Sequence, residues 1–252
     1  MCTVSWILNT RGYDVFFNRD EQKGRAIAIP PSSFSLEGTE CLMPLDPDGG
    51  GTWIATNQYG LSLCLLNYYQ GDVPELPLIS RGLLVKMLAP MASVPEVVAT
   101  LNSLHMGSYA PFTLLLFAPD LTSNHGHVIA FQWDGHVLTQ RPSVEPMISS
   151  SVAFQEVMLA RRQAYKDYME PTPTIENAWA FHRSHVPEAG YKSVCMHRED
   201  ANTVSFTHLS ITPCNSQMRY VDGSPCENKK SVTTEITRKS SSLKWVASDM
   251  SD

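Results

Sequence analysis

The first 21 residues, MCTVSWILNTRGYDVFFNRDE, predict a hairpin that returns a polar cluster to the start of the chain. Residues 3–8 are mostly apolar and β-branched or aromatic, as in a buried strand. A short turn follows, and residues 13–17 predict a second strand. Because an antiparallel hairpin brings its two ends together, Cys2 and Arg19 would be neighbours in space.

Cys2 becomes a candidate nucleophile once Met1 is removed, and the small size of cysteine favours that removal. The residue would then carry an α-amine that titrates near ~8 beside a thiol that titrates near ~8.5. Such an amine can take the thiol proton directly or through a water. One residue would supply nucleophile and general base, as in N-terminal nucleophiles. Many chains begin with Met-Cys by chance, so the residues that follow carry the argument.

The polar residues 18–21 could serve this thiol. A nearby guanidinium lowers the pKa of a thiol, so Arg19 would favour the thiolate. Asp20 would hold the α-ammonium or orient Arg19. The alternative is a hairpin that simply ends in solvated charges. The strand that carries Cys2 just before this run favours the chemical interpretation.

A second candidate is Asn67, at which the apolar run Leu61–Leu66 ends. A side-chain amide in that place could donate a hydrogen bond to a developing oxyanion. The alternative is an asparagine that caps a turn at the end of a strand. Asn57, which precedes a Gln-Tyr-Gly sequence, is expected to serve that turn instead.

Together these segments resemble a known family. Cys2, residues 18–21, the Gly-Thr-Trp of residues 51–53 and the Asn-Tyr of residues 67–68 are similar to the NRDE family, also called the transport and Golgi organisation protein two family. That family resembles the choloylglycine hydrolase and penicillin V acylase group. The resemblance follows the order of motifs over residues 2–225. It implies an α+β fold, the four-layer αββα sandwich of N-terminal-nucleophile hydrolases, with Asn67 in the oxyanion hole.

The same resemblance suggests binding residues. Ser150 best matches a further asparagine of the hydrolases, although a hydroxyl reaches less far than an amide. His197 follows a segment that resembles a strand near the hydrolase active site, and a strand-end surface histidine is the alternative. Asn18 and Glu21 are expected beside Cys2.

Two assignments stay open. Asp20 and Glu21 both match the aspartate of the hydrolases, because the spacing of this run differs slightly. For their later active-site arginine, Arg198 is a candidate by residue type only.

Composition indicates a globular domain without nucleic-acid partners. The 252 residues are 43% hydrophobic and 17% charged, with a net charge of −6. No apolar run approaches a membrane span, and the N-terminus lacks the features of a signal peptide, so a cytoplasmic protein is expected. We predict one domain over residues 2–226 and a flexible polar tail over residues 227–252, apart from a candidate strand at 231–237.

Neither a metal nor a cofactor is predicted. The six cysteines form no Cys-x-x-Cys pair, which argues against a zinc or redox motif. The histidine pairs 125/127 and 182/185 lack a third ligand at a useful spacing. Cys214 and Cys226 could pair in an oxidising compartment, but a reducing cytoplasm is the simpler interpretation.

The rest of the chain alternates loops, helices and strands. Residues 22–50 are expected to form loops because they are rich in proline and glycine. Helices are predicted at 81–88, 94–104, 154–168 and 175–185. Strands are predicted at 52–56, 61–66, 112–118, 128–133, 136–139, 194–197, 203–212 and 217–221.

The leading functional hypothesis is an amidohydrolase or acyltransferase that acts on a small amide or acyl substrate, within the class that cleaves carbon–nitrogen bonds other than peptide bonds. Cys2 would attack the carbonyl carbon, and water would release the acyl group. The competing hypothesis is a non-enzymatic protein on the same fold, which binds a ligand or acts in membrane traffic and Golgi organisation.

Overall fold

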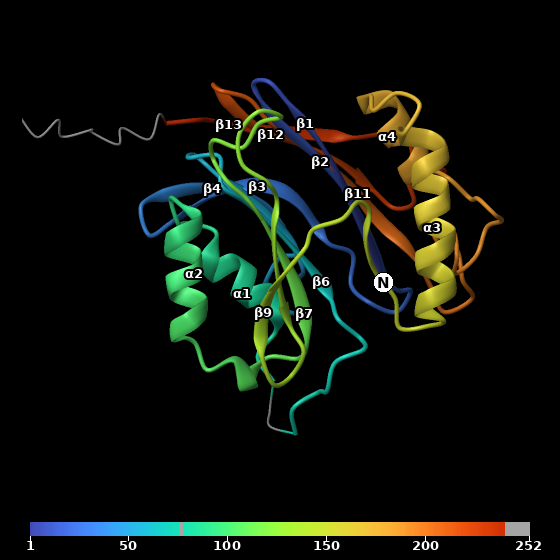
Figure 1. Cartoon of the computed structure of the whole chain (residues 1–252), viewed down its shortest axis with the longest axis horizontal. Coiled ribbons are helices and arrows are strands. Elements are labelled where there is room, and N and C mark those ends of the chain that lie inside the picture. Colours follow the sequence, from blue (N-terminus) through green and yellow to red (C-terminus); the bar gives the residue numbers. More distant parts are fainter. Residues whose placement is uncertain (76–77, 240–252) are drawn as a thin grey trace, which may run out of the picture.

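Two antiparallel sheets pack face to face between two layers of helices (Figure 1). This computed structural model of the chain describes residues 1–75 and 78–239. The predicted α+β sandwich is therefore confirmed. No helix within the described residues is long and apolar enough to cross a membrane.

The first sheet has the strand order β10-β1-β2-β11-β12-β13. Its strands are β1 (Cys2–Asn9), β2 (Gly12–Gln22), β10 (Met147–Ser149), β11 (Ala201–Ile211), β12 (Asn215–Asp222) and β13 (Val232–Thr237). The second sheet runs β3-β4-β5-β6-β7-β8-β9. Its strands are β3 (Ile29–Leu36), β4 (Thr39–Leu45), β5 (Ile54–Asn57), β6 (Ser62–Asn67), β7 (Phe112–Phe117), β8 (Ile129–Trp133) and β9 (Leu138–Arg141).

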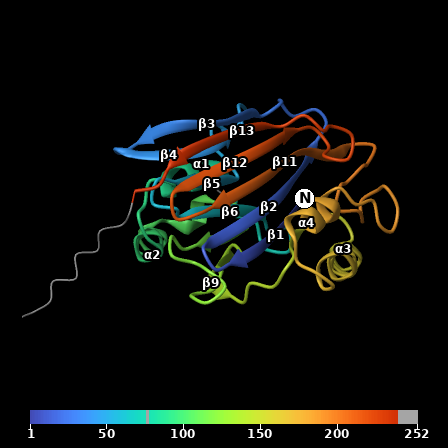
Figure 2. The same ribbon diagram turned by 90° about the horizontal axis from the view of Figure 1, so that it is seen from above.

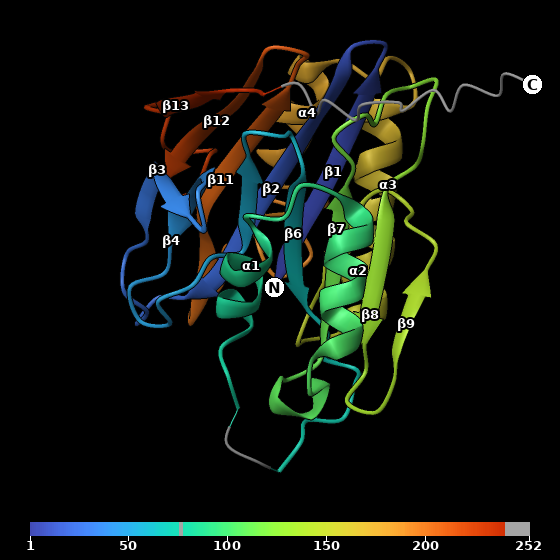
Figure 3. The ribbon, with the colours of Figure 1, turned by 90° about the vertical axis from the view of Figure 1, so that its left-hand side faces the viewer.

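Each outer face of the sandwich is covered by two helices. The second sheet is covered by α1 (Arg81–Leu88) and α2 (Val94–Ser103), which lie in front of β6 and β7 in Figure 3. The first sheet is covered by α3 (Phe154–Met169) and α4 (Ile175–His182), which lie together beside β1 and β2 in Figure 2. Ser93 and Thr174 cap α2 and α4 through their side-chain oxygens, and both helices begin where the sequence predicts.

The hairpin predicted at the N-terminus is present. Cys2 pairs with Arg19 at one end of β1 and β2, and Asn9 pairs with Gly12 at the other. Successive residues of β2 point to opposite faces. Phe17 therefore packs in the core between the sheets, whereas Phe16 packs in the core under α4.

Two regions differ from the prediction. Residues 22–50 contain the hairpin β3–β4, which turns at Glu37 and Gly38, both with positive φ. Pro30 and Pro31 are tolerated because β3 is an edge strand. Residues 194–197 form no strand and make only a single bridge through His197.

The C-terminal part of the sheet extends past the predicted domain end at residue 226. The candidate strand at 231–237 is present as β13, which pairs with β12. Residues 240–252 of the predicted tail lie outside the described residues.

Candidate active site

Cys2, Arg19 and Ser149 occupy matching positions on three adjacent strands. Cys2 pairs with Ser149 on β10 and with Arg19 on β2. Side chains at paired positions share one face of a sheet, so all three point into the space between the two sheets. Arg19 is buried there, with its guanidinium 4.3 Å from the ring centre of Trp53.

A cavity of about 400 Å³ opens at this end of the sandwich. Cys2 and Arg19 line it from the first sheet, and Asn67 lines it from the end of β6 in the second. The Asn67 amide donates a hydrogen bond to the Tyr69 hydroxyl at 2.9 Å. The structure thus brings Cys2, Arg19 and Asn67 to one cavity, and Asp20 also lines it.

The Gly-Thr-Trp motif shapes the wall of this cavity. A Cβ atom on Gly51 would lie 2.2 Å from the carbonyl carbon of Gly82, so only glycine permits this approach. The Thr52 N–H donates to the Gly82 carbonyl at 3.1 Å. These contacts hold the first turn of α1 against the cavity.

The cavity carries an unusual density of charge. Arg19 lies 3.6 Å from Glu21 and 3.6 Å from Asp46, and Arg25 also pairs with Asp46. Arg81, by contrast, donates to the Pro111 carbonyl at 2.8 Å and has no acidic partner among the described residues. Burial lowers the pKa of the Arg81 guanidinium.

Met1 occupies a buried place next to Cys2. Its carbonyl accepts a hydrogen bond from the Asp20 N–H at 3.0 Å, and its amino group donates to the Asp20 carbonyl at 3.3 Å. Its side chain packs in an apolar cluster with Val157, Met196 and Ala201. Burial raises the pKa of the Cys2 thiol, and the smaller opposing effects of the amino terminus and Arg19 do not cancel this rise.

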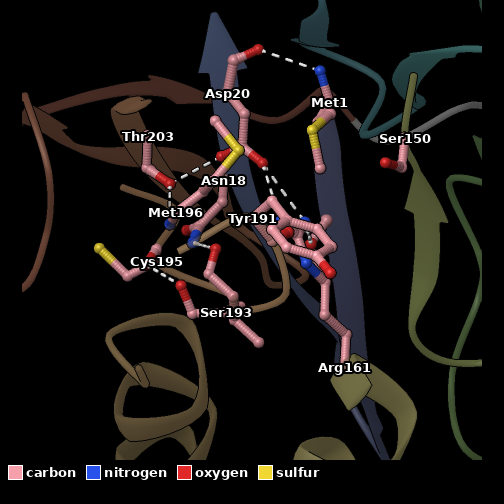
Figure 4. Close-up of polar contacts among 12 residues, drawn as sticks. Met1, Asn18, Asp20, Ser150, Arg161, Tyr191, Ser193, Cys195, Met196 and Thr203 are labelled. Carbon is pink, nitrogen blue, oxygen red and sulfur yellow. Dashed lines mark hydrogen bonds and ion pairs between the residues drawn. The ribbon is translucent and has the colours of Figure 1, made fainter. Parts of the chain in front are cut away.

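The Asp20 carboxylate lies on the other face of the sheet, away from the cavity. It lies 3.3 Å from the Arg161 guanidinium and accepts a hydrogen bond from the Thr203 hydroxyl at 2.7 Å (Figure 4). Both charged side chains are fully buried. Asp20 therefore reaches Cys2 through its main chain, and Arg161 fixes that strand end from behind.

A comparison with known families identifies the chain's relatives. The family model described as Transport and Golgi organisation 2 matches residues 1–157. The chain belongs to the Transport and Golgi organisation 2 family. The resemblance inferred from its motifs is thereby confirmed, although no curated protein matches the chain in sequence.

Solved structures show which fold this family member shares. It is similar to the cysteine-to-alanine mutant of conjugated bile acid hydrolase from Clostridium perfringens, with a TM-score of 0.55 and 13% identity, over 95% of this chain and 97% of that one. It is similar to a second variant of that hydrolase with a TM-score of 0.53 and 12% identity, over 94% of this chain and 97% of that one. It is also similar to the Caenorhabditis elegans ortholog of N-acylethanolamine-hydrolyzing acid amidase, with a TM-score of 0.55 and 11% identity, over 83% of this chain and 92% of that one.

Three other predicted site residues lie away from the cavity in this family member. The Asn18 amide donates to the carbonyls of His182 and Val194, both at 2.9 Å. The Ser150 hydroxyl accepts from the Val152 N–H in a local turn at 3.1 Å. His197 lies 3.2 Å from the Cys226 sulfur.

The remaining candidates divide between the cavity and its surroundings. Glu21 lines the cavity beside Arg19. Arg198 pairs with Asp200 at 2.7 Å and lines a neighbouring cavity with Met1. Asn57 serves its turn, because its side-chain oxygen accepts from the Tyr59 N–H at 2.9 Å.

Sequence reasoning missed Arg161, Arg81 and Ser149. Arg161 carries a detectable signal, because it is a lone charged residue on the buried stripe of α3 between Val157 and Ala164. Nothing local marks the other two, because the pairing of β10 with β1 places Ser149 opposite Cys2 and the approach of α1 brings Arg81 to the cavity.

Proposed function

We propose that this family member is an N-terminal-cysteine amidohydrolase or acyltransferase that acts on a small amide through an acyl-enzyme at Cys2. The observation that carries the proposal is the cavity that the Cys2 thiol shares with Arg19 and Asn67. The fold shared with a bile acid hydrolase and an acid amidase supports the hydrolase class.

Removal of Met1 prepares the site in this proposal. It leaves the α-amine on Cys2, beside the main chain of Asp20 that now holds Met1. It also vacates the buried volume that the Met1 side chain fills against Val157 and Met196. The new amine is close enough to take the thiol proton, because both groups belong to one residue.

The reaction then proceeds in two halves. The Cys2 sulfur attacks the carbonyl carbon, and the carbonyl oxygen becomes an oxyanion. The Asn67 amide turns from Tyr69 toward this oxyanion and donates to it. The α-ammonium gives its proton to the departing amine as the carbon–nitrogen bond breaks. Water, or an acceptor amine in a transferase, then cleaves the thioester and restores the thiol.

Ser149 is the second donor in this proposal. Its hydroxyl is buried and has no hydrogen-bond partner among the residues described by the structure. It sits on β10 directly opposite Cys2, whereas Ser150, the expected match, uses its hydroxyl in a turn. We therefore place Ser149, rather than Ser150, beside the oxyanion in this proposal.

The charges of the cavity favour a substrate with a carboxylate. Arg19 and Arg25 already contact Glu21 or Asp46, whereas Arg81 contacts only a main-chain oxygen among the described residues. A guanidinium without an acidic partner pairs well with a carboxylate. A cavity of about 400 Å³ suits a small molecule. We therefore expect N-acyl amino acids to react faster than neutral N-acyl amines of the same length.

Turnover assays on matched proteins test the proposal. The chain is produced behind a cleavable leader that leaves either Cys2 or Met1 as the first residue. Each protein is incubated with N-acyl amino acids and N-acyl amines, and the released amine is measured. The Cys2-first protein should release amine, Cys2→Ala should release none, and Cys214→Ala should match the wild type because Cys214 is exposed and outside the cavity. Full turnover by Cys2→Ala would refute the covalent mechanism.

One observation favours the alternative of a ligand-binding protein without turnover. Met1 is only 7% exposed and is held by two main-chain contacts, so a protein that keeps Met1 has a well-packed site. In that case both Met1-first and Cys2-first proteins would bind an acyl ligand, measured by calorimetry, and neither would release amine. The proposal also keeps the cytoplasm as the compartment, where free thiols persist.

A further inference from the structure

A second cluster of reactive side chains lies on the helix side of the first sheet, apart from the proposed active site. It consists of His185, Cys195, His197 and Cys226, and one ligand atom from each lies within 4.8 Å of all the others. None of the four lines the cavity that contains Cys2. The cluster therefore needs an explanation of its own.

We propose that these four residues bind one zinc ion in a tetrahedral Cys₂His₂ site. The two sulfurs lie 3.2 Å apart, and the His197 Nε2 atom lies 3.2 Å from one sulfur and 3.7 Å from the other. Zinc–sulfur and zinc–nitrogen bonds of about 2.3 and 2.1 Å imply a sulfur–sulfur edge of about 3.8 Å and a sulfur–nitrogen edge of about 3.6 Å, so the two sulfurs would move apart by about 0.6 Å on binding. Two thiolates and two imidazoles are also the donor set that selects zinc over hard cations.

Three separate segments of the chain build this site. The Cys195 N–H donates to the Ser184 carbonyl at 3.0 Å, which holds the His185 segment beside it. Cys226 follows a turn that Ser224 anchors, because the Ser224 hydroxyl donates to the Thr203 carbonyl at 2.8 Å. These two hydrogen bonds help to position the ligands before any metal binds.

Binding would proceed with loss of two protons. Each cysteine thiol releases its proton to solvent as a zinc–sulfur bond forms, so two thiolates balance the charge of the dication. Each histidine binds as neutral imidazole through one ring nitrogen. Nothing is oxidised or reduced.

The site would stabilise the structure behind the cavity. The Met196 N–H, between two ligands, donates to the Thr203 hydroxyl at 2.8 Å, and that hydroxyl donates to Asp20 (Figure 4). The metal would therefore tie residues 184–197 and 224–226 to the strand that carries Asp20. Its role is structural, since all four protein ligands leave no open position for a substrate.

The chain order explains why sequence spacing argued against a metal. Cys195 and His197 are two residues apart, but the other two ligands lie 10 residues before and 31 residues after Cys195. No compact motif results, and only the fold brings the four together.

Metal analysis of the purified full chain tests the site. The wild type, isolated without chelators, should hold about one zinc per chain, and cobalt added after chelation should give the strong visible bands and sulfur-to-cobalt charge transfer of a tetrahedral site. Cys226→Ala and His197→Ala should lose that spectrum, whereas Cys214→Ala should keep it. Chelation should lower the melting temperature of the wild type.

Three results would overturn the proposal. The first is a wild-type protein with no bound zinc and only the weak spectrum of aqueous cobalt, a result that needs no variant to fold. The second is a Cys195–Cys226 disulfide in protein made and kept under reducing conditions, detected as two missing thiols. The third is an unchanged cobalt spectrum in folded Cys226→Ala. Amide turnover plays no part, so the outcome is independent of the proposed active site.

Discussion

The four consecutive residues 18–21 divide between two different regions of the molecule. Asn18 and Asp20 point to the helix side, where Asn18 bonds to main-chain carbonyls and Asp20 pairs with buried Arg161. Arg19 and Glu21 line the cavity on the opposite side. One half of the motif holds the strand in place, and the other half faces the thiol. Because successive side chains of a strand point to opposite faces, neighbouring residues of this motif have different roles.

Loss of Arg161 should have the largest effect on stability. Arg161→Ala leaves the Asp20 carboxylate buried without its cation, which typically costs about 3–5 kcal/mol of unfolding free energy. Arg19→Ala, on the cavity side, should cost less, about 1 kcal/mol, because its carboxylate partners Glu21 and Asp46 are partly exposed and keep Arg25 as a second cation. Urea unfolding of both variants measures the difference.

A double variant provides the control for this comparison. Asp20→Asn with Arg161→Met removes both charges and keeps much of the volume, so it should regain a large part of the lost stability. Equal destabilisation by Arg161→Ala and Arg19→Ala would contradict the claim that the helix side of β2 contributes more to stability than the cavity side.

On the second sheet, Asn67 and Asn57 are expected to differ in the same way, one serving the reaction and the other the stability of the fold. Asn67→Ala should slow acylation of Cys2 by ~10²–10³-fold and leave substrate affinity nearly unchanged, because a donor aimed at an oxyanion acts only when charge develops. Asn57→Ala should lower the melting temperature instead, since its amide holds carbonyls of Ala89 and Met91. Single-turnover acylation followed by mass, with thermal unfolding, separates the two. If Asn57→Ala acylates more slowly than Asn67→Ala, the assignment is reversed.

The N-terminal hairpin and residues 18–21 show how much of the fold and the site the sequence predicts. Two runs of apolar, β-branched and aromatic residues on either side of a turn are sufficient to predict the β1–β2 hairpin and the pairing of Cys2 with Arg19. The sequence predicts a second strand that ends at residue 17 and one polar cluster at residues 18–21, whereas β2 continues to Gln22. A longer strand would have predicted that they alternate between faces.

Other features depend on contacts between distant segments. Arg161 pairs with Asp20, which lies 141 positions earlier in the chain. Ser149 lies opposite Cys2 only because β10 joins the edge of the sheet. The hairpin β3–β4 was hidden by prolines that an edge strand tolerates. Local patterns predict strands and helices, but they do not predict which faces meet.

A partly buried carboxylate, Glu145, sharpens the comparison with Asp20. Glu145 accepts a hydrogen bond from the Trp6 N–H at 2.7 Å and has no cation beside it among the described residues. Burial raises its pKa from 4.5 to about 7. The folded state therefore holds this proton more tightly than the unfolded state, so the stabilising contribution is full below pH 4.5 and is lost as the pH rises through about 7.

Glu145→Gln should remove this pH dependence. At pH 8 the variant should be more stable than the wild type by at most about 3 kcal/mol, the equivalent of the rise in pKa, and the gain should shrink toward pH 4.5. Urea unfolding at several pH values measures it. A gain that is the same at every pH would exclude the titration of Glu145 as its cause.

The smallest effect is expected for the influence of Arg19 on the thiol. Arg19→Ala should raise the pKa of Cys2, because a nearby positive charge is lost, and Arg19→Lys should restore it in part. The shift should be smaller than the one caused by neutralising the amino terminus, whose effect on the thiol exceeds that of Arg19. Alkylation rate against pH, followed on the Cys2 peptide, gives both. An unchanged profile in Arg19→Ala would place its charge away from the sulfur.

Peptide mapping of the acylated protein tests the central claim most directly. Cys2-first and Met1-first proteins are mixed with an activated acyl amide, quenched in acid, and digested, and the position of the acyl group is read by mass. The account predicts one acyl group on the Cys2 sulfur of the Cys2-first protein and little or none on the Met1-first protein. Equal labelling of the two proteins, or labelling of Cys214 in place of Cys2, would contradict it.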